Sequence, residues 1–279
     1  MVAGRQVFSF GEDRFRSTTV GVLANTNNRF SYTDRPSEIV YGERRSSLET
    51  DFTVDVYRGL YVGLNYLYRS IDFSFDQGSP AEQEFSERIL RQAGAEKTID
   101  SGGGLVVFFD NRDHEYNPTQ GVFATLKFRD FAEWLGSDND YYSADAVFNA
   151  YWDVKSAHRL AFRFRWRVAF GDVPFSGQST YGGVDLRAYP RGKYRGAGML
   201  AGQVEYRFPI WKRLRGVAFG GSGRVYGEEL TLGADRVLPS GGGGIRFLLL
   251  EDRDVLVGLD VAIGRFGNRG LYFSFGEAF

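Results

Sequence analysis

The sequence predicts an all-β protein: a transmembrane, antiparallel up-and-down β-barrel of about twelve strands that takes up nearly all of the 279 residues. Two observations predict this fold. Side chains alternate with a period of two over most of the chain, and the connections between the alternating segments are by turns long and short. A mean hydropathy of -0.31 agrees with a membrane barrel, because only every second residue faces lipid and the interior is polar.

The clearest alternation lies in residues 160–170, LAFRFRWRVAF, where six apolar side chains point to one face. The opposite face carries two alanines and three arginines, Arg163, Arg165 and Arg167. Similar patterns predict strands near residues 17–30, 45–58, 60–75, 99–110, 119–133, 140–153, 157–171, 197–209, 213–226, 240–250, 253–264 and 270–279.

The expected connections fall into two sets that alternate along the chain. The long ones are 31–44, 76–98, 134–139, 172–196, 227–239 and 265–269, and the short ones lie around Gly59 and at 111–118, 154–156, 210–212 and 251–252. In outer-membrane barrels the short turns are periplasmic, and an even strand number puts both termini on that side. Residues 1–16 are then a short periplasmic N-terminal segment and residues 17–279 a single barrel domain. A soluble β-sandwich or lipocalin-type barrel is the alternative, but these folds rarely need twelve strands of this length.

Composition narrows the possible functions. The formal net charge is -1, which gives no reason to expect a nucleic-acid partner, and the absence of cysteine excludes a disulfide scaffold and thiolate metal sites. No segment is apolar over the roughly 20 residues that a membrane helix needs. The first residues, MVAGRQVF, are not a signal peptide, so an exported protein would be a mature form with an added Met. No metal site, cofactor or enzymatic activity is expected.

The last ten residues, GLYFSFGEAF, place Phe273 and Phe275 on one face of a strand and end on Phe279. A terminal aromatic residue that closes an alternating strand resembles the signal by which assembly machinery recognises outer-membrane barrels. These three phenylalanines are therefore the expected C-terminal assembly signal.

The stretch YGGVDLRAYPRGKYRG, residues 181–196, is rich in glycine and basic residues and lies between two alternating segments. Within it, Leu186, Arg187, Ala188 and Tyr189 resemble the [VI]-R-G-[FY] loop motif of the BamA/TamA superfamily of outer-membrane insertases and translocases. Five predicted strands follow the loop, as in that family. Residues 110–121, DNRDHEYNPTQG, resemble a recurrent periplasmic turn of the family, and GQVEYRFPI resembles the strand after the loop.

The resemblance implies that the long extracellular loop folds into the barrel lumen and that Arg187 meets an acidic residue there, Glu205. Ala188 and Gly221 stand where the family has a glycine and an aspartate, so Asp260, two strands further on, is the expected second partner of Arg187. The alternative is a solvated basic loop that contacts lipopolysaccharide phosphates. For Arg191, Lys193 and Arg195 this alternative is at least as well supported.

The implied function is to assist insertion or export of proteins or lipids at the bacterial outer membrane, in a short form without POTRA domains. Expected partners are outer-membrane lipids and lipopolysaccharide, the barrel-assembly machinery during biogenesis, and client proteins or lipids. A second copy is a further possible partner if Gly216, Ala218 and Gly220 face lipid. A passive pore or structural barrel without a client is the main alternative.

An outer-membrane phospholipase is a weaker alternative, because it needs a histidine at the outer leaflet. His114 and His158 are both predicted in short turns at the opposite end. The arginine row at 163, 165 and 167 is interpreted first as part of a structural salt-bridge network and second as the lining of an anion-selective pore.

Overall fold

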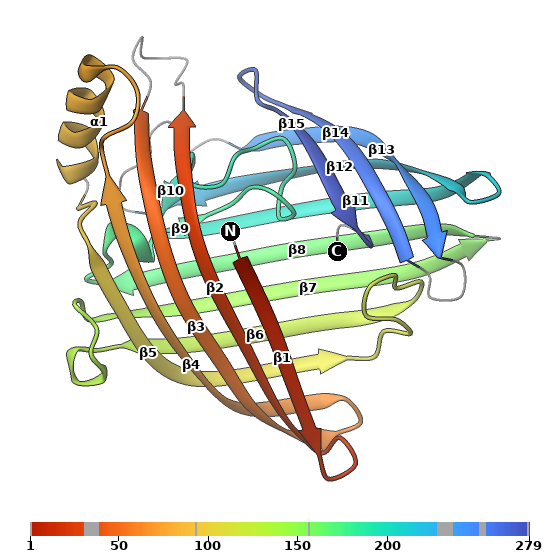
Figure 1. Cartoon of the computed structure of the whole chain (residues 1–279). Coiled ribbons are helices and arrows are strands. Elements are labelled where there is room, and N and C mark those ends of the chain that lie inside the picture. Colours follow the sequence, from red (N-terminus) through yellow and green to blue (C-terminus); the bar gives the residue numbers. More distant parts are fainter. Residues whose placement is uncertain are drawn as a thin grey trace.

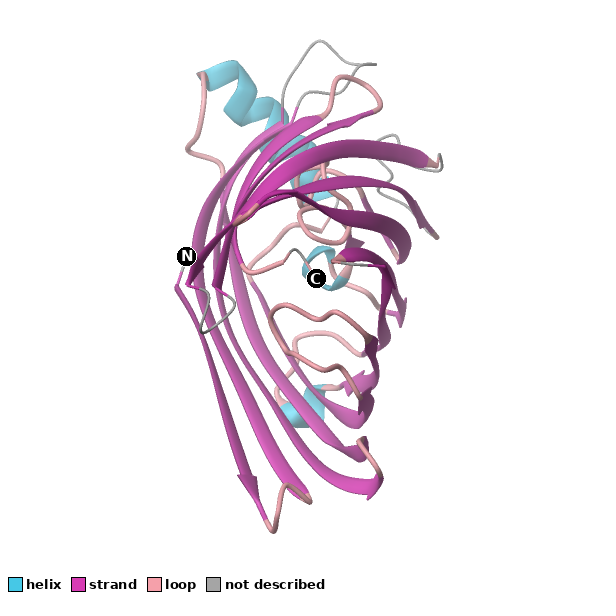
Figure 2. Ribbon diagram, turned by 90° about the vertical axis from the view of Figure 1, so that its right-hand side faces the viewer, coloured by secondary structure: helices cyan, strands magenta, loops and turns pink. Residues whose placement is uncertain are grey.

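The structure is a computed structural model that describes residues 2–30, 39–92, 94–155, 157–227, 237–250, 255–277 and 279. Its main element is one antiparallel sheet of thirteen strands in chain order, curved into a shell around a central lumen (Figures 1 and 2). The strands are β1 (Val2–Phe10), β2 (Phe15–Phe30), β3 (Ile39–Tyr57), β4 (Leu60–Ser74), β5 (Thr98–Asp110), β6 (Gly121–Phe131), β7 (Tyr141–Lys155), β8 (His158–Gly171), β11 (Gly198–Trp211), β12 (Leu214–Tyr226), β13 (Leu238–Leu250), β14 (Val255–Gly264) and β15 (Arg269–Phe275).

The sheet contains all twelve predicted strands and one more at its N-terminal edge. Val2–Phe10, expected to precede the barrel, pairs with β2 from Val2 opposite Leu23 to Phe10 opposite Phe15. The turn between the two strands has positive φ at Gly11, Glu12 and Asp13. The described residues thus form a sheet of thirteen strands, so the parity argument that placed both termini at one end does not apply to it.

The connections fall into two sets that alternate along the chain as expected, but their lengths do not alternate strictly, since 111–120 is longer than 265–268. One set, at 11–14, 58–59, 111–120, 156–157, 212–213 and 251–254, belongs to one end of the sheet, here called the short-connection end. The other set comprises 31–38, 75–97, 132–140, 172–197, 227–237 and 265–268. Within these connections, residues 31–38, 93, 156, 228–236 and 251–254 fall outside the described part of the chain.

The sheet has two edges, β1 and β15, and in the described residues no ladder joins them. Figure 2 shows the shell open on this side. β1 covers only the Phe15–Leu23 part of β2, so the rest of β2, from Ala24 to Phe30, also lacks a neighbour on that side. The gap between these edges is called the seam below.

One long connection contains a helix that the alternation pattern did not predict, α1 (Pro80–Gln92). The signal was present as a capping box: the Ser79 backbone N–H donates to Glu82 over 2.7 Å, and the Glu82 N–H donates back to the Ser79 hydroxyl over 3.4 Å. Leu90 packs with Ile39 and Tyr41 of β3 and with Phe175. In the described part of the chain, no helix has the length and apolarity required to cross a membrane.

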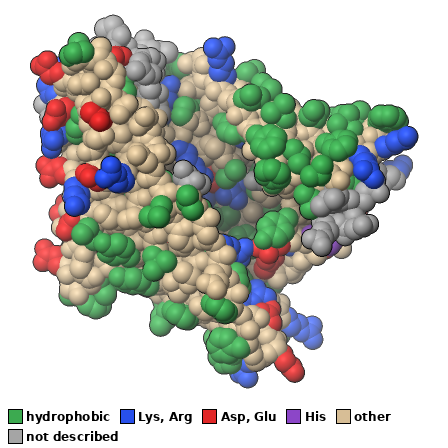
Figure 3. Space-filling model, viewed as in Figure 1, with side chains coloured by type: hydrophobic (Ala, Val, Ile, Leu, Met, Phe, Trp, Pro, Cys, Tyr) green, Lys and Arg blue, Asp and Glu red, His purple; other side chains and the backbone are tan. Residues whose placement is uncertain are grey.

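The outer surface of the wall is apolar over several strands, because every second residue points outward. Figure 3 shows hydrophobic side chains gathered over the C-terminal strands and over the N-terminal ones. The exposed apolar residues include Leu200, Val204, Leu259, Val261, Ile263, Leu271, Phe273 and Phe275. The opposite faces of these strands carry the lumenal side chains.

Candidate functional site

The long connection between β8 and β11, residues 172–197, folds into the lumen against β11–β14 (Figure 1). It includes the short strands β9 (Ser179–Thr180) and β10 (Arg195–Gly196), which pair with each other. Tyr181, Tyr189 and Tyr194 pack together with ring centroids 5.6–5.9 Å apart. This loop, called the lumenal loop below, is therefore an ordered, buried structure, and the alternative of a solvated surface loop is wrong.

Arg187 lies at the centre of the contacts between the lumenal loop and the wall and is 1% exposed. Its Nη2 lies 2.6 Å from Oε2 of Glu205 on β11, and its Nη1 lies 2.8 Å from Oδ2 of Asp260 on β14. The guanidinium carbon also stacks 3.4 Å from the ring centroid of Phe219. The planar guanidinium thus contacts two carboxylates and an aromatic face at once, which an ammonium group could not do.

Two further arginines extend this contact into a network. Arg207 donates from Nε to Glu205 over 2.7 Å, and Arg246 donates from Nη2 to Asp260 over 3.0 Å. Both also approach Glu277, at 3.6 Å from Arg207 and 3.1 Å from Arg246. The lumenal network is defined here as Arg187, Arg207, Arg246, Glu205, Asp260 and Glu277.

The lumenal network balances three guanidinium groups with three carboxylates. Each of the six charged groups contacts two groups of opposite sign. The main-chain oxygen of Phe279 accepts a further hydrogen bond from Arg207 over 3.0 Å. Because buried charges are costly unless they are paired and hydrogen-bonded, this balance is what permits their burial. Removal of one member leaves an uncompensated charge in a low-dielectric interior.

Glycines make room for the network and for the lumenal loop. A Cβ on Gly244 would lie 1.9 Å from Oδ1 of Asp260, and one on Gly258 would lie 2.8 Å from Nη1 of Arg246. On Gly264 it would lie 2.7 Å from the Tyr189 ring. The glycines of these strands therefore let large side chains and the lumenal loop approach the wall closely.

The two departures from the expected loop motif have different structural consequences. Ala188 has φ of +86°, in the left-handed region that favours glycine, so a residue with a Cβ is held there at a cost. At Gly221, where an aspartate was expected, the space is taken by Gln203: a Cβ there would lie 2.6 Å from its Cγ. Gln203 Oε1 accepts from the backbone N–H of Arg187 over 3.3 Å.

The arginine row of β8 pairs with carboxylates on two different elements. Arg163 contacts Asp185 of the lumenal loop at 2.7 Å, whereas Arg165 and Arg167 share one oxygen of Asp145 on β7, at 2.7 and 2.8 Å. Lys193 and Arg195 are also buried, so the surface contact considered for them is wrong, whereas Arg191 is exposed and its surface contact stays a prediction. Lys193 donates to Asn268 over 3.0 Å, and Arg195 stacks on Phe175.

Other residues identified from the sequence lie apart from the network. Phe273 and Phe275 are 66% and 73% exposed on the outer face of β15. Phe279 follows a turn at Gly276, where φ is +81°, and lies on the lumenal side, 6.0 Å from the Arg187 guanidinium carbon. The three phenylalanines therefore do not share a face. Ala218 and Gly220 face outward, while Gly216 is covered by the Phe208 ring.

Sequence reasoning did not assign roles to Arg207, Arg246, Glu277, Gln203 and Phe219. Gln203, Glu205 and Arg207 are every second residue of β11 and face the same side, so Gln203 and Arg207 could have been expected beside Glu205. Arg246 and Asp260 lie on the lumenal faces of neighbouring strands, opposite Gly258 and Gly244. A charged residue facing a glycine across a strand pair was the available signal.

Comparison with known proteins identifies the architecture. The Omp85 superfamily domain matches residues 6–247. BamA from Haemophilus ducreyi lacking POTRA domains 1–3 has a similar structure, with a TM-score of 0.65 and 16% sequence identity, over 98% of this chain and 60% of that one. CdiB from Acinetobacter baumannii has a TM-score of 0.57 and 13% identity, over 94% and 50%.

This chain thus spans 60% and 50% of the lengths of those two structures, and at such low identity the likeness shows the fold. No curated protein matches the sequence. The family domain covers most of the strands from β1 to β13, including the lumenal loop with Arg187. The chain therefore belongs to the Omp85 superfamily.

Proposed function

We propose that this chain assists the insertion or export of proteins or lipids at the bacterial outer membrane, with the seam as the working surface. The observation that supports this proposal is the pair of unpaired edges, β1 and β15. An unpaired strand edge offers a row of backbone donors and acceptors to an incoming strand. In a bilayer, where water cannot satisfy these groups, such pairing is strongly favoured.

The lumenal network supports a second part of the proposal, which is that it fixes the lumenal loop while the seam opens or fills. Arg187 joins the loop to β11 and β14, and Glu277 joins the chain end after β15 to β13. One side of the seam is therefore braced from inside. β1 has no comparable buried ion pair among its described contacts, since its Arg5–Glu115 pair is exposed.

The other proposed partners follow from the orientation that we propose for the barrel in the outer membrane. The apolar outer faces contact lipid, the long connections reach lipopolysaccharide, and the short-connection end with the C-terminal residues is periplasmic. The assembly machinery would meet the C-terminal strand during biogenesis. A homodimer through the small outward residues Ala218 and Gly220 is a further part of the proposal.

The test is acceleration of client folding. Purified protein is reconstituted into liposomes, and the folding of a urea-denatured small outer-membrane barrel is followed by gel shift against empty liposomes. We expect faster folding with the wild type and a smaller effect with Arg187→Ala. Arg91→Ala, an exposed arginine of α1 paired with Glu87, is the matched control.

The proposal fails if the client folds at the same rate with the reconstituted protein as with empty liposomes, although the reconstituted protein is itself folded. Ion conductance of planar bilayers then tests the passive pore. A lumen filled by the ordered loop predicts low conductance, so a large stable current would favour the pore over the insertase.

A further inference from the structure

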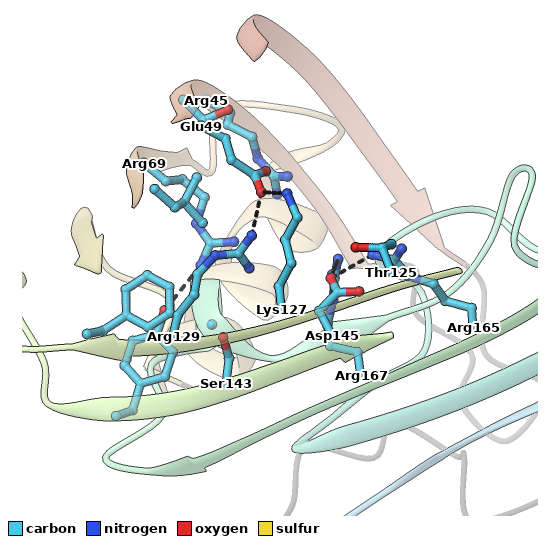
Figure 4. A pocket seen from close by; sticks show the side chains of 15 residues that line it. Arg45, Glu49, Arg69, Thr125, Lys127, Arg129, Ser143, Asp145, Arg165 and Arg167 are labelled. Carbon is cyan, nitrogen blue, oxygen red and sulfur yellow. Dashed lines mark hydrogen bonds and ion pairs between the residues drawn. The ribbon is translucent and has the colours of Figure 1, made fainter. Parts of the chain in front are cut away.

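A second charged region lies in the lumen between the N-terminal strands and β6–β8, away from the lumenal network. Two neighbouring cavities of about 360 and 460 Å³ occur there, and Arg45, Arg69, Arg165 and Arg167 line both. Figure 4 shows the first cavity, with Arg45 and Arg69 reaching from one wall toward Lys127, Arg129, Arg165 and Arg167 on the facing strands. The cavities together are called the basic cavity below.

Cations outnumber carboxylates in the basic cavity. Among the described residues, nine cationic side chains line it: Arg45, Arg69, Lys127, Arg129, Arg163, Arg165, Arg167, Arg191 and Arg195. The carboxylates that line it or pair with these cations are six: Glu43, Glu49, Asp51, Asp100, Asp145 and Asp185. The difference, nine minus six, is an excess of three positive charges, although most of these cations share a carboxylate with a neighbour.

The pairing pattern shows where this excess lies, since several carboxylates are shared. Asp145 serves both Arg165 and Arg167, and Glu43 serves Arg45 at 2.7 Å and Arg195 at 3.8 Å. A shared carboxylate cannot neutralise two guanidinium groups. The contrast with the lumenal network, where charges balance three to three, is clear.

Unused hydrogen-bond donors point to the same place. The Nε atoms of Arg45 and Arg165 and the hydroxyl of Ser176 have no hydrogen-bond partner, and Ser176 is only 5% exposed. All three residues line the second cavity. Buried donors without partners are rare in folded proteins, and they indicate an unfilled role such as binding of a ligand or ion.

From this charge excess and these donors we propose that the basic cavity binds a phosphate-type oxyanion. Arginine forks match the oxygens of a phosphate group, and an anion would supply the missing negative charge and accept from the unused donors. The cavity is large enough for the group with several waters, each needing about 30 Å³. Figure 3 shows Lys and Arg side chains on the wall of the hollow that faces the viewer.

Two sources carry this chemistry: a membrane lipid whose phosphate enters through the seam, or a soluble phosphate from the aqueous side. The soluble arm titrates inorganic phosphate into the purified protein in a non-ionic detergent by calorimetry, at constant ionic strength set with chloride. The lipid arm uses native mass spectrometry of the same protein in micelles that contain phosphatidic acid or, for comparison, phosphatidylcholine.

We expect one arm to show saturable binding by the wild type. Arg45→Gln and Arg165→Gln should each weaken it roughly ten- to a hundredfold, since each removes charge-assisted hydrogen bonds. Ser176→Ala removes one neutral donor and should weaken it severalfold, and it keeps the test valid if an arginine variant does not fold. Arg91→Gln removes an equal charge on the exposed face of α1 and should leave binding unchanged.

Binding in the phosphate arm alone would assign a soluble ligand, and binding of phosphatidic acid but not phosphatidylcholine would assign a lipid. The proposal is overturned if neither probe binds the wild type in preference to chloride or phosphatidylcholine. It is equally overturned if all three cavity variants bind as the wild type does.

Discussion

Arg246 on β13 donates from Nε to Oε2 of Glu277 over 3.1 Å, and both side chains are almost completely buried. Glu277 lies after the last strand, so this contact joins the chain end to the wall from the lumenal side. Arg207 approaches the same carboxylate from β11 at 3.6 Å. The C-terminal residues thus complete the lumenal network instead of merely following the sheet.

Glu277→Gln is expected to destabilise the folded barrel by about 3 kcal/mol, because it leaves Arg207 and Arg246 with less compensation in a buried site. The measurement is the temperature at which the folded band disappears on a gel of samples heated in steps. Glu115→Gln, which affects an exposed pair with Arg5, is the control and should cost less than about 1 kcal/mol. Equal loss in both variants would contradict the role assigned to Glu277.

Arg187→Ala is expected to cost about 3–5 kcal/mol, because Glu205 and Asp260 both lose a buried counter-charge. Arg187→Lys should recover only part of this, since an ammonium group cannot bond both carboxylates and stack on Phe219. Unfolding by guanidinium in detergent measures both. A Lys variant as stable as the wild type would show that charge alone is sufficient.

Ala188→Gly is expected to stabilise the protein by about 1 kcal/mol. The φ of +86° costs an alanine more than the extra unfolded-state entropy costs a glycine. Ala201→Gly, at a buried strand position, is the comparison and should destabilise. The midpoints of chemical denaturation of the two variants measure these changes in stability. A loss of stability in Ala188→Gly would show that the backbone of Ala188 is not strained.

Hydrogen exchange should distinguish the seam from the closed wall. The amides of β1 that do not pair with β2, and those of Ala24–Phe30 that face the seam, have no sheet partner and should exchange fast. Amides of β7, which pairs on both sides, should exchange slowly. Mass spectrometry of peptic peptides from the detergent-solubilised protein measures this, and equal protection of β1 and β7 would mean that the seam is closed in solution.

The stability of the turn that contains Asp113, at the short-connection end, is expected to fall in acid. Burial would raise its pKa, but hydrogen bonds from Thr119, Gln120 and His114 outweigh this and lower the pKa. A lowered folded-state pKa stabilises the turn above the unfolded value, near pH 4, and this contribution is lost as the pH falls below it. Asp113→Asn should therefore reduce the stability difference between pH 7 and pH 3, measured by proteolysis at residues 111–120, and an unchanged difference would contradict it.

Strands and connections could be predicted because period-two alternation directly reflects a wall with lipid outside and polar groups inside. β1 was missed because its apolar residues are mixed with Arg5, Gln6 and Gly4, and α1 because its capping box is only four residues long. The contacts of Arg187 with Glu205 and Asp260 could be anticipated from the loop motif and strand facing. The contact between Glu277 and Arg246 could not, because it depends on the turn at Gly276, which the alternation does not encode.

The position of Glu277 and Phe279 sets the order in which this protein can reach its final form. Arg207 contacts an oxygen of a residue 72 positions later, and Arg187 contacts a carboxylate 73 positions later. Contacts so distant in sequence form late, since the intervening chain must first be arranged. Docking of residues 181–196 therefore cannot be completed until Asp260 on β14 is in place, and the network is complete only when Glu277 has joined it. A chain that stops before Glu277 would retain its early hairpins but leave Arg207 and Arg246 each with one carboxylate instead of two.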